Sequence, residues 1–124
     1  MLALVVDDSR AMRSIVKKIV AAEGYAVLEA GDGVAALAVL DASEEVPSVA
    51  LLDWNMPEMN GFDLLQAVRA QPRYSAMRVV MITTETELEF MGRALEAGAD
   101  EYLMKPFDGA ALRGKLALIG LAAA

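Results

Sequence analysis

Apolar positions along the chain follow two alternating patterns. Short, nearly continuous apolar runs are each followed by a segment in which apolar residues recur every three to four positions, and the pair of patterns repeats five times. Continuous runs are typical of parallel strands buried on both faces, and the longer spacing is typical of helices that cover a sheet. The predicted strands are Leu2 to Val6, Ala26 to Ala30, Val49 to Leu52, Arg78 to Ile82 and Glu101 to Met104.

The helices predicted between these strands have suitable residues at their ends. Ser9, Asp32 and Asn60 can cap the first three, and the last two are expected from about Thr86 to Ala97 and from about Asp108 to Leu121. Five strand and helix pairs predict a single α/β domain over residues 1–124. The fold should be flavodoxin-like and doubly wound, with a five-stranded parallel sheet in the order 2-1-3-4-5.

Composition excludes several classes of function. The chain has no Cys and no His, which removes thiol nucleophiles, imidazole bases and the usual zinc ligands, so a metal would need oxygen ligands. A net charge of −7 argues against nucleic-acid binding, because that requires a basic surface. Neither a membrane-spanning apolar run nor a signal peptide can be recognised, so we expect a cytoplasmic protein that does not bind membranes.

Chemically reactive residues stand at the carboxyl ends of four of the five predicted strands. Asp7 and Asp8 follow the first strand, Asp53 the third, Thr83 the fourth and Lys105 the fifth. Open α/β sheets bind ligands outside this edge, so the side chains are expected to meet in one crevice. Each residue alone can be explained as a helix cap or a loop residue. Their coincidence at matched strand ends favours a site.

Three neighbouring carboxylates need a proton or a cation, because like charges raise one another's pKa. Mg²⁺, or Mn²⁺ in its place, prefers oxygen ligands and keeps positions open for a phosphoryl oxygen. Phosphoryl transfer is catalysed mainly by positioning and charge stabilisation, which Lys105, Thr83 and backbone N–H groups near Trp54 and Thr84 could supply. Asp53, in the middle of the crevice, is the predicted nucleophile.

These residues stand in motifs that resemble those of bacterial two-component response-regulator receiver domains of the CheY-like chemotaxis type. The resemblance covers essentially the whole chain. Its motifs are Val6-Asp7-Asp8-Ser9, Leu52-Asp53-Trp54-Asn55-Met56-Pro57 with Asn60-Gly61, then Thr83, and finally Tyr102 to Phe107.

The resemblance implies a role for each matching residue at the acidic end. Asp53 would be the phosphoacceptor. Asp8, Asp53 and the backbone carbonyl of Asn55 would bind Mg²⁺ directly, and Asp7 would hold a metal-bound water. Asn55 and Glu85 would tune the rate of dephosphorylation.

The remaining matches imply a phosphoryl contact and a switch. Lys105 would pair with the phosphoryl group, and Thr83 would form a hydrogen bond to it. Thr83 and Tyr102 would then change position together as the protein switches. The Lys105–Pro106 peptide would be cis.

The resemblance further implies a stand-alone signalling protein that is not an enzyme, apart from its own phosphorylation and autodephosphorylation. A CheA-like histidine kinase would be the phosphodonor of this monomer, and the target would bind a face formed by the fourth helix, fifth strand and fifth helix. The flagellar switch is one candidate target. However, Glu85 to Glu89 is an acidic stretch where enteric-type relatives are basic, so an acidic partner would be repelled there.

Other functions remain open at this point. Within the family, the chain could be a phosphorelay intermediate or a phosphate sink outside chemotaxis. An aspartyl-phosphate phosphatase of the haloacid-dehalogenase type would need a second Asp two residues after the nucleophile, where this chain has Asn55. An FMN carrier would need a Ser/Thr-rich phosphate loop after the first strand, where this chain has Asp7 and Asp8.

Overall fold

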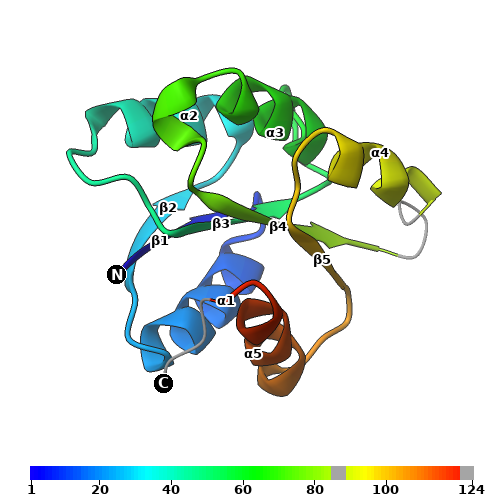
Figure 1. Ribbon diagram of the computed structural model, residues 1–124. Coiled ribbons are helices and arrows are strands. Elements are labelled where there is room, and N and C mark those ends of the chain that lie inside the picture. Colours follow the sequence, from blue (N-terminus) through cyan, green and yellow to red (C-terminus); the bar gives the residue numbers. More distant parts are fainter. Residues whose placement is uncertain (85–88, 121–124) are drawn as a thin grey trace.

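The computed structural model describes residues 1–84 and 89–120. One sheet contains five parallel strands in the order β2-β1-β3-β4-β5, with helices on both of its faces (Figure 1). The strands are β1 (Leu2–Val6), β2 (Ala26–Ala30), β3 (Val49–Asp53), β4 (Arg78–Thr83) and β5 (Glu101–Met104). The helices are α1 (Arg10–Ala22), α2 (Gly33–Ala42), α3 (Gly61–Arg69), the 3₁₀ turn η1 (Pro72–Tyr74), α4 (Met91–Glu96) and α5 (Gly109–Leu118). The predicted doubly wound fold and strand order are confirmed.

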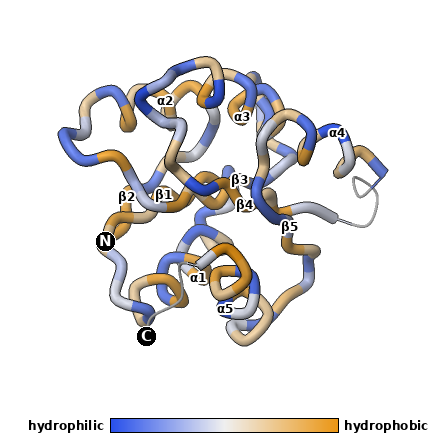
Figure 2. The backbone as a smooth tube through the Cα atoms, in the orientation of Figure 1, coloured by the Kyte–Doolittle hydropathy of each residue, from blue (hydrophilic) through white to orange (hydrophobic). Residues whose placement is uncertain are grey.

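The sheet separates two hydrophobic cores. Helices α2, α3 and α4 cover one face, and α1 and α5 cover the other (Figure 1). Leu52 and Met81 belong to the core beneath the first helix layer, and Leu51 and Leu112 to the core beneath the second. Every residue of β1 and β3 is buried, as expected for inner strands of a sheet covered on both sides. Figure 2 shows these apolar strands between the two helix layers.

Four of the five predicted helix starts are confirmed by side-chain capping. Ser9, Asp32, Asn60 and Asp108 each accept a hydrogen bond from the backbone N–H three residues later, at 2.7–3.2 Å. Such caps satisfy N–H groups that have no partner within the helix. Gly98, which directly follows the predicted end of the fourth helix at Ala97, has a φ of 113°, which a glycine adopts without strain.

Two strands are longer than predicted, and both extensions reach the candidate site. β3 includes Asp53 and β4 includes Thr83, whereas the apolar runs had suggested ends at Leu52 and Ile82. The difference arises because polar side chains end an apolar pattern, although their backbone continues the hydrogen-bond ladder. The two residues are therefore held by the sheet itself.

The helices differ from the prediction in detail. The described part of the fourth helix begins at Met91, and its predicted start near Thr86 falls in residues 85–88, outside the described ranges, as does Leu121. Ile15 and Val34 belong to the apolar helical spacing of the first two helices, but they are 50% and 53% exposed. The η1 turn was not predicted. Throughout the two described ranges, every helix is too short or too polar to cross a lipid bilayer.

Candidate functional site

Four strands bring charged or hydroxyl side chains to one edge of the sheet. Asp7 follows β1, Asp53 ends β3, Thr83 ends β4 and Lys105 follows β5. The parallel register places Asp53 level with Ile82, the residue before Thr83. It also places Thr83 level with the residue before Lys105. The predicted convergence at the carboxyl ends of the strands is therefore present.

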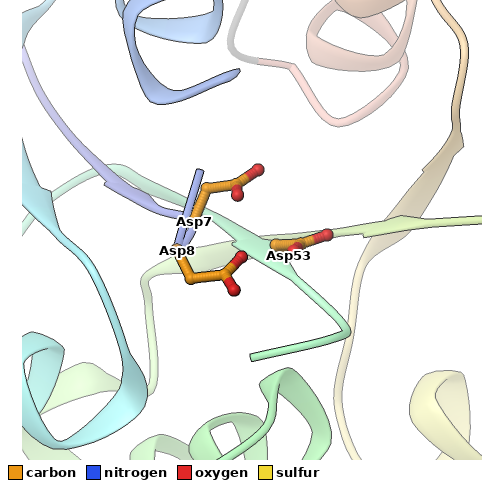
Figure 3. A group of neighbouring side chains, drawn as sticks. All are labelled: Asp7, Asp8 and Asp53. Carbon is orange, nitrogen blue, oxygen red and sulfur yellow. The ribbon is translucent and has the colours of Figure 1, made fainter. Parts of the chain in front are cut away.

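Three carboxylates at this edge form one acidic cluster (Figure 3). Asp7, Asp8 and Asp53 each provide an oxygen, and these three oxygens lie within 4.8 Å of one another. Asp7 and Asp53 are only 1% and 4% exposed, whereas Asp8 is open to solvent. Negative charges buried this close together repel one another, so the cluster is stabilised by a bound cation or by a proton.

Lys105 supplies positive charge to this acidic cluster. Its Nζ lies 2.9 Å from Oδ1 of Asp53 and 3.6 Å from Oδ2 of Asp7. The Lys105–Pro106 peptide is cis, as the family resemblance implied. One ammonium group that contacts two of the three clustered carboxylates leaves the cluster with an excess of negative charge, so it can attract a further cation.

The pKa values of the central pair reflect this imbalance. The pKa of Asp53 is raised from 3.8 to about 6, because burial, with the charges of Asp7 and Asp8, outweighs the hydrogen bond and charge of Lys105. Burial lowers the pKa of Lys105, but its hydrogen bond to Asp53 and the charges of Asp53 and Asp7 outweigh burial and leave that pKa raised. Lys105 is therefore an ammonium ion at neutral pH, and Asp53 is a carboxylate whose charge is poorly stabilised.

Asp7 has one oxygen that is satisfied and one that is not. Oδ1 accepts a hydrogen bond from the Ser9 N–H at 2.8 Å, while the buried Oδ2 has no hydrogen-bond donor among the described residues. Arg13 also holds Asp7 in place, since its Nη1 donates to the backbone carbonyl of Asp7 at 2.7 Å. A buried oxygen without a donor is costly unless water or a metal ion contacts it. An all-oxygen donor set of this kind fits Mg²⁺ or Mn²⁺.

The groups predicted to contact a phosphoryl group are only partly available. Thr83 is fully buried, and its hydroxyl donates to the backbone carbonyl of Thr84 at 3.1 Å. Of the backbone N–H groups near Trp54 that were considered for a phosphoryl oxygen, that of Trp54 itself donates to the carbonyl of Ile82 at 2.9 Å in this conformation. The strand ladder between β3 and β4 continues one residue past Asp53 and uses this donor.

Gly61 holds the loop after Asp53 against α3. A Cβ at this position would collide with the carbonyl oxygen of Asp53 and would lie 3.0 Å from Cα of Trp54. The Gly61 N–H also donates to the Trp54 carbonyl at 2.9 Å. Glycine permits this close approach of two backbones. Asn55, the predicted source of a carbonyl ligand, is exposed at the start of this loop.

The predicted switch residue Tyr102 lies on β5, the edge strand next to β4. It is half-buried and is level with Met81 of β4. Lys115 of α5 places its Nζ 4.6 Å from the centre of the Tyr102 ring and also pairs with Glu101 at 3.3 Å. Glu85, the other predicted tuning residue, lies outside the described ranges.

An aromatic contact next to the phosphoacceptor candidate was missed from the sequence. Trp54 packs against Phe62 of α3 and against Phe90, the residue before α4. Nothing in the local sequence pairs these rings, because they come from three separate elements. The sequence shows only that Phe90 is a large apolar residue, and the structure leaves it 40% exposed.

Comparisons with known proteins agree with this geometry. Residues 3–117 match the family model described as "Response regulator receiver domain". The chain is 46% identical to chemotaxis protein CheY1 of Helicobacter pylori over 117 residues, 94% of each chain. It is 45% identical to a chemotaxis protein CheY homolog of Campylobacter jejuni over 114 residues, 91% of this chain and 87% of that one.

Solved structures with the same fold come from several signalling contexts. The chemotaxis response regulator CheY4 of Vibrio cholerae superposes with a TM-score of 0.86 at 36% identity, covering 95% of this chain and 97% of that one. The signal receiver domain of a signal transduction histidine kinase from Syntrophus aciditrophicus superposes with a TM-score of 0.84 at 27% identity, covering 95% and 88%.

Proposed function

The chain belongs to the response regulator receiver domain family, and on that premise we propose that it accepts a phosphoryl group on Asp53 and then signals to a protein partner. It resembles the CheY chemotaxis regulators, and signalling by phosphorylation is consistent with the family. One observation supports Asp53 as the acceptor: this buried carboxylate contacts the Lys105 ammonium at 2.9 Å and lies in a cluster with two further acids.

Mg²⁺ is the proposed cofactor, and Mn²⁺ should replace it. Asp8, Asp53 and the backbone carbonyl of Asn55 would hold the ion, and the unsatisfied Oδ2 of Asp7 would accept from a metal-bound water. When bound, the ion supplies positive charge that offsets the repulsion among the carboxylates and phosphoryl oxygens. The acidic cluster and the oxygen without a donor support this assignment.

The proposed reaction moves a phosphoryl group from a kinase phosphohistidine to this chain. A carboxylate oxygen of Asp53 attacks phosphorus, the P–N bond breaks, and its electron pair returns to the imidazole nitrogen. With a pKa of about 6, Asp53 is largely ionised at neutral pH and can act as the nucleophile. Lys105, already 2.9 Å from Asp53, can neutralise a phosphoryl oxygen without a large movement. Thr83 can donate its hydroxyl after turning away from Thr84.

Output would follow from a population shift between two packings. Phosphorylation would draw Thr83 toward Asp53 and Tyr102 inward, and so change the face formed by α4, β5 and α5. We propose chemotaxis as the pathway, with a CheA-like histidine kinase as donor, and a cytoplasmic monomer as the acting species. The named functions of the Helicobacter and Campylobacter relatives support chemotaxis. A receiver domain from a histidine kinase keeps a phosphorelay role as the second candidate.

Phosphorylation by a small donor tests the acceptor directly. Acetyl phosphate with Mg²⁺ should add one phosphoryl group per chain, measured by intact mass. The fluorescence of Trp54, the one tryptophan of the chain, should change in parallel because the indole adjoins Asp53. EDTA should prevent both changes, and Mn²⁺ should restore them.

Two variants separate a site effect from a general one. Asp53→Asn should abolish the mass increase, whereas Asp41→Asn, which changes an exposed acid at the end of α2, should keep it. A phosphoryl adduct that survives Asp53→Asn would show that the acceptor is another residue. Turnover of phosphate esters by catalytic amounts of the protein would instead support an aspartyl-phosphate phosphatase.

A further inference from the structure

Three aromatic rings and one arginine connect the loop after Asp53 to α4. The Trp54 ring lies 5.6 Å from the Phe62 ring at an interplanar angle of 32°, and 6.4 Å from the Phe90 ring at 21°. Arg93 of α4 places its guanidinium carbon 5.5 Å from the centre of the Phe62 ring. We refer to Trp54, Phe62, Phe90 and Arg93 as the aromatic clamp.

The side of the clamp nearest the site is fixed to the sheet. Trp54 directly follows Asp53, its N–H donates to the Ile82 carbonyl at 2.9 Å, and its carbonyl accepts from Gly61 at 2.9 Å. Both backbone groups of Trp54 are therefore engaged, one with β4 and one with α3. Because Trp54 is the next residue after Asp53, a shift of the Asp53 backbone would carry Trp54 with it, together with its bonds to β4 and α3.

The α4 side of the clamp depends on tertiary contacts. The structure describes α4 over Met91–Glu96. Phe90 stands at its N-cap position without a side-chain capping bond. Met91 and Ala94 bury one side of the helix, and the contacts of Phe90 with Trp54 and of Arg93 with Phe62 hold its first turn. Stacked rings and a cation over a ring each favour one arrangement of their partners.

We propose that Phe90 and Arg93 are positioning residues that couple α4 to the phosphoacceptor loop by a route separate from Thr83 and Tyr102. The inference rests on the proposed phosphorylation of Asp53. Phosphorylation of Asp53 would shift the Trp54 indole, and the shifted indole would favour one position of α4 through its contact with Phe90. Arg93 holds the same helix turn to Phe62, whose own helix is locked to the loop by Gly61.

Hydrogen exchange of the α4 amides tests this coupling in the full chain. Exchange over Met91–Glu96 is measured by mass spectrometry with and without acetyl phosphate and Mg²⁺, and intact mass records the phosphorylated fraction of the same samples. Phosphorylation should change the wild-type exchange rate by about fivefold or more, the usual size of coupling between sites. Phe90→Ala and Arg93→Gln should each lose most of this change while still accepting one phosphoryl group per chain.

Two further variants serve as matched controls. Phe90→Tyr keeps a stacking ring and should keep the wild-type response. Leu95→Ala removes a similarly exposed apolar side chain from the same helix, and it should also keep the response. A loss that is confined to the clamp variants would separate coupling from simple loosening of α4.

Each remaining outcome decides between the two proposals. A wild-type response in a phosphorylated Phe90→Ala protein overturns the clamp and leaves the proposed function intact. If Phe90→Ala exposes α4 fully even without phosphodonor, Arg93→Gln decides in the same way, because it leaves the Trp54–Phe90 stack in place. Absence of any mass increase in the wild-type protein overturns the proposed function, and the clamp with it.

Discussion

The two ends of the sheet each hold a group of charged residues, and the groups are built in opposite ways. At the carboxyl end, Lys105 contacts two of three clustered carboxylates, and the buried Oδ2 of Asp7 has no hydrogen bond among the described residues, only the 3.6 Å ion pair with Lys105. At the amino end, one carboxylate, Asp100, receives several donors. Its Oδ2 accepts from Arg69 at 3.0 Å and from the Val79 N–H at 2.8 Å.

Both members of the Arg69–Asp100 pair have further hydrogen-bond partners. Arg69 also donates to the carbonyls of Gly98 and Tyr74 at 2.9 and 3.0 Å, and Arg78 donates to Oδ1 of Asp100 at 3.4 Å. A partly buried network in which opposite charges are paired holds the structure together. A cluster with an excess of negative charge instead favours the binding of a cation. The comparison indicates that the amino end holds α3, β4 and β5 together, while the carboxyl end keeps an excess of negative charge, which agrees with the cation proposed to bind there.

Removing Asp100, the acid of the amino-end network, should have the largest effect on stability. Asp100→Ala leaves the Arg69 guanidinium and the Val79 N–H without their acceptor, so the free energy of unfolding should fall by about 3 kcal/mol. Urea denaturation measures the change. Asp41→Ala, at an exposed acid on α2, is the control and should change little. A loss for Asp100→Ala no larger than for this control would contradict a structural role for the network.

Neutralising Asp53, in the carboxylate cluster at the carboxyl end, should have the opposite effect and raise the free energy of unfolding. The folded-state pKa of Asp53 is raised to about 6, so without metal its ionisation destabilises the folded state, and this cost develops as pH rises from about 4 to about 6. Above that range Asp53→Asn should be more stable than the wild type by about 2 kcal/mol, allowing for water at the site. Below about pH 4 the two should converge, since both carry a neutral side chain.

Urea titrations of both proteins in EDTA, at several pH values, measure this difference. Mg²⁺ should reduce it, because ion binding stabilises the wild type selectively. An Asp53→Asn protein that is less stable than the wild type at pH 8 in EDTA would mean that Lys105 already compensates the cluster.

Backbone strain also distinguishes the carboxyl end. Glu58, in the loop after β3, has a φ of 62° and is the one non-glycine residue with a positive φ in the described ranges. Glu58→Gly should remove steric strain that exceeds the added chain entropy, and so raise the free energy of unfolding by about 0.5–1 kcal/mol. The matched control is Glu44→Gly, at an exposed position with ordinary φ, which should be slightly destabilising. Equal effects of the two substitutions would show that the Glu58 conformation is unstrained.

The carboxyl end could be predicted from sequence because its residues obey a positional rule. Asp7, Asp53, Thr83 and Lys105 each stand where an apolar run ends, and a parallel sheet brings such positions together. The caps Ser9, Asp32 and Asn60 were predictable because their signals are local in the chain. The strand order followed from the doubly wound fold that five strand and helix pairs fit. The exact ends of β3 and β4 were not, because an apolar pattern stops before the backbone ladder does.

The amino-end network could not be predicted, because its signal is not local. Arg69 ends α3 and Asp100 precedes β5. No sequence pattern around either residue indicates that the two are in contact. The aromatic clamp was missed for a similar reason, since Trp54, Phe62 and Phe90 meet only after three elements have packed. Side-chain pairs of this kind depend on helix orientation, which hydrophobic periodicity leaves undetermined.

The smallest predicted effect tests which donor holds the amino-end network. Arg78 is 51% exposed at its side chain and contacts Asp100 at 3.4 Å, whereas Arg69 is 18% exposed and contacts it at 3.0 Å. Arg78→Gln should therefore lower the free energy of unfolding by about 0.5 kcal/mol or less, as expected of a solvated ion pair. Arg69→Gln, which also weakens two carbonyl contacts, should lower it by about 2 kcal/mol. Urea denaturation at low and high salt separates them further, because salt screens the exposed pair and leaves the buried one nearly unchanged. If the two substitutions cost the same, Asp100 would be stabilised by the general positive charge of both arginines, and the contrast between the two ends would rest on charge balance alone.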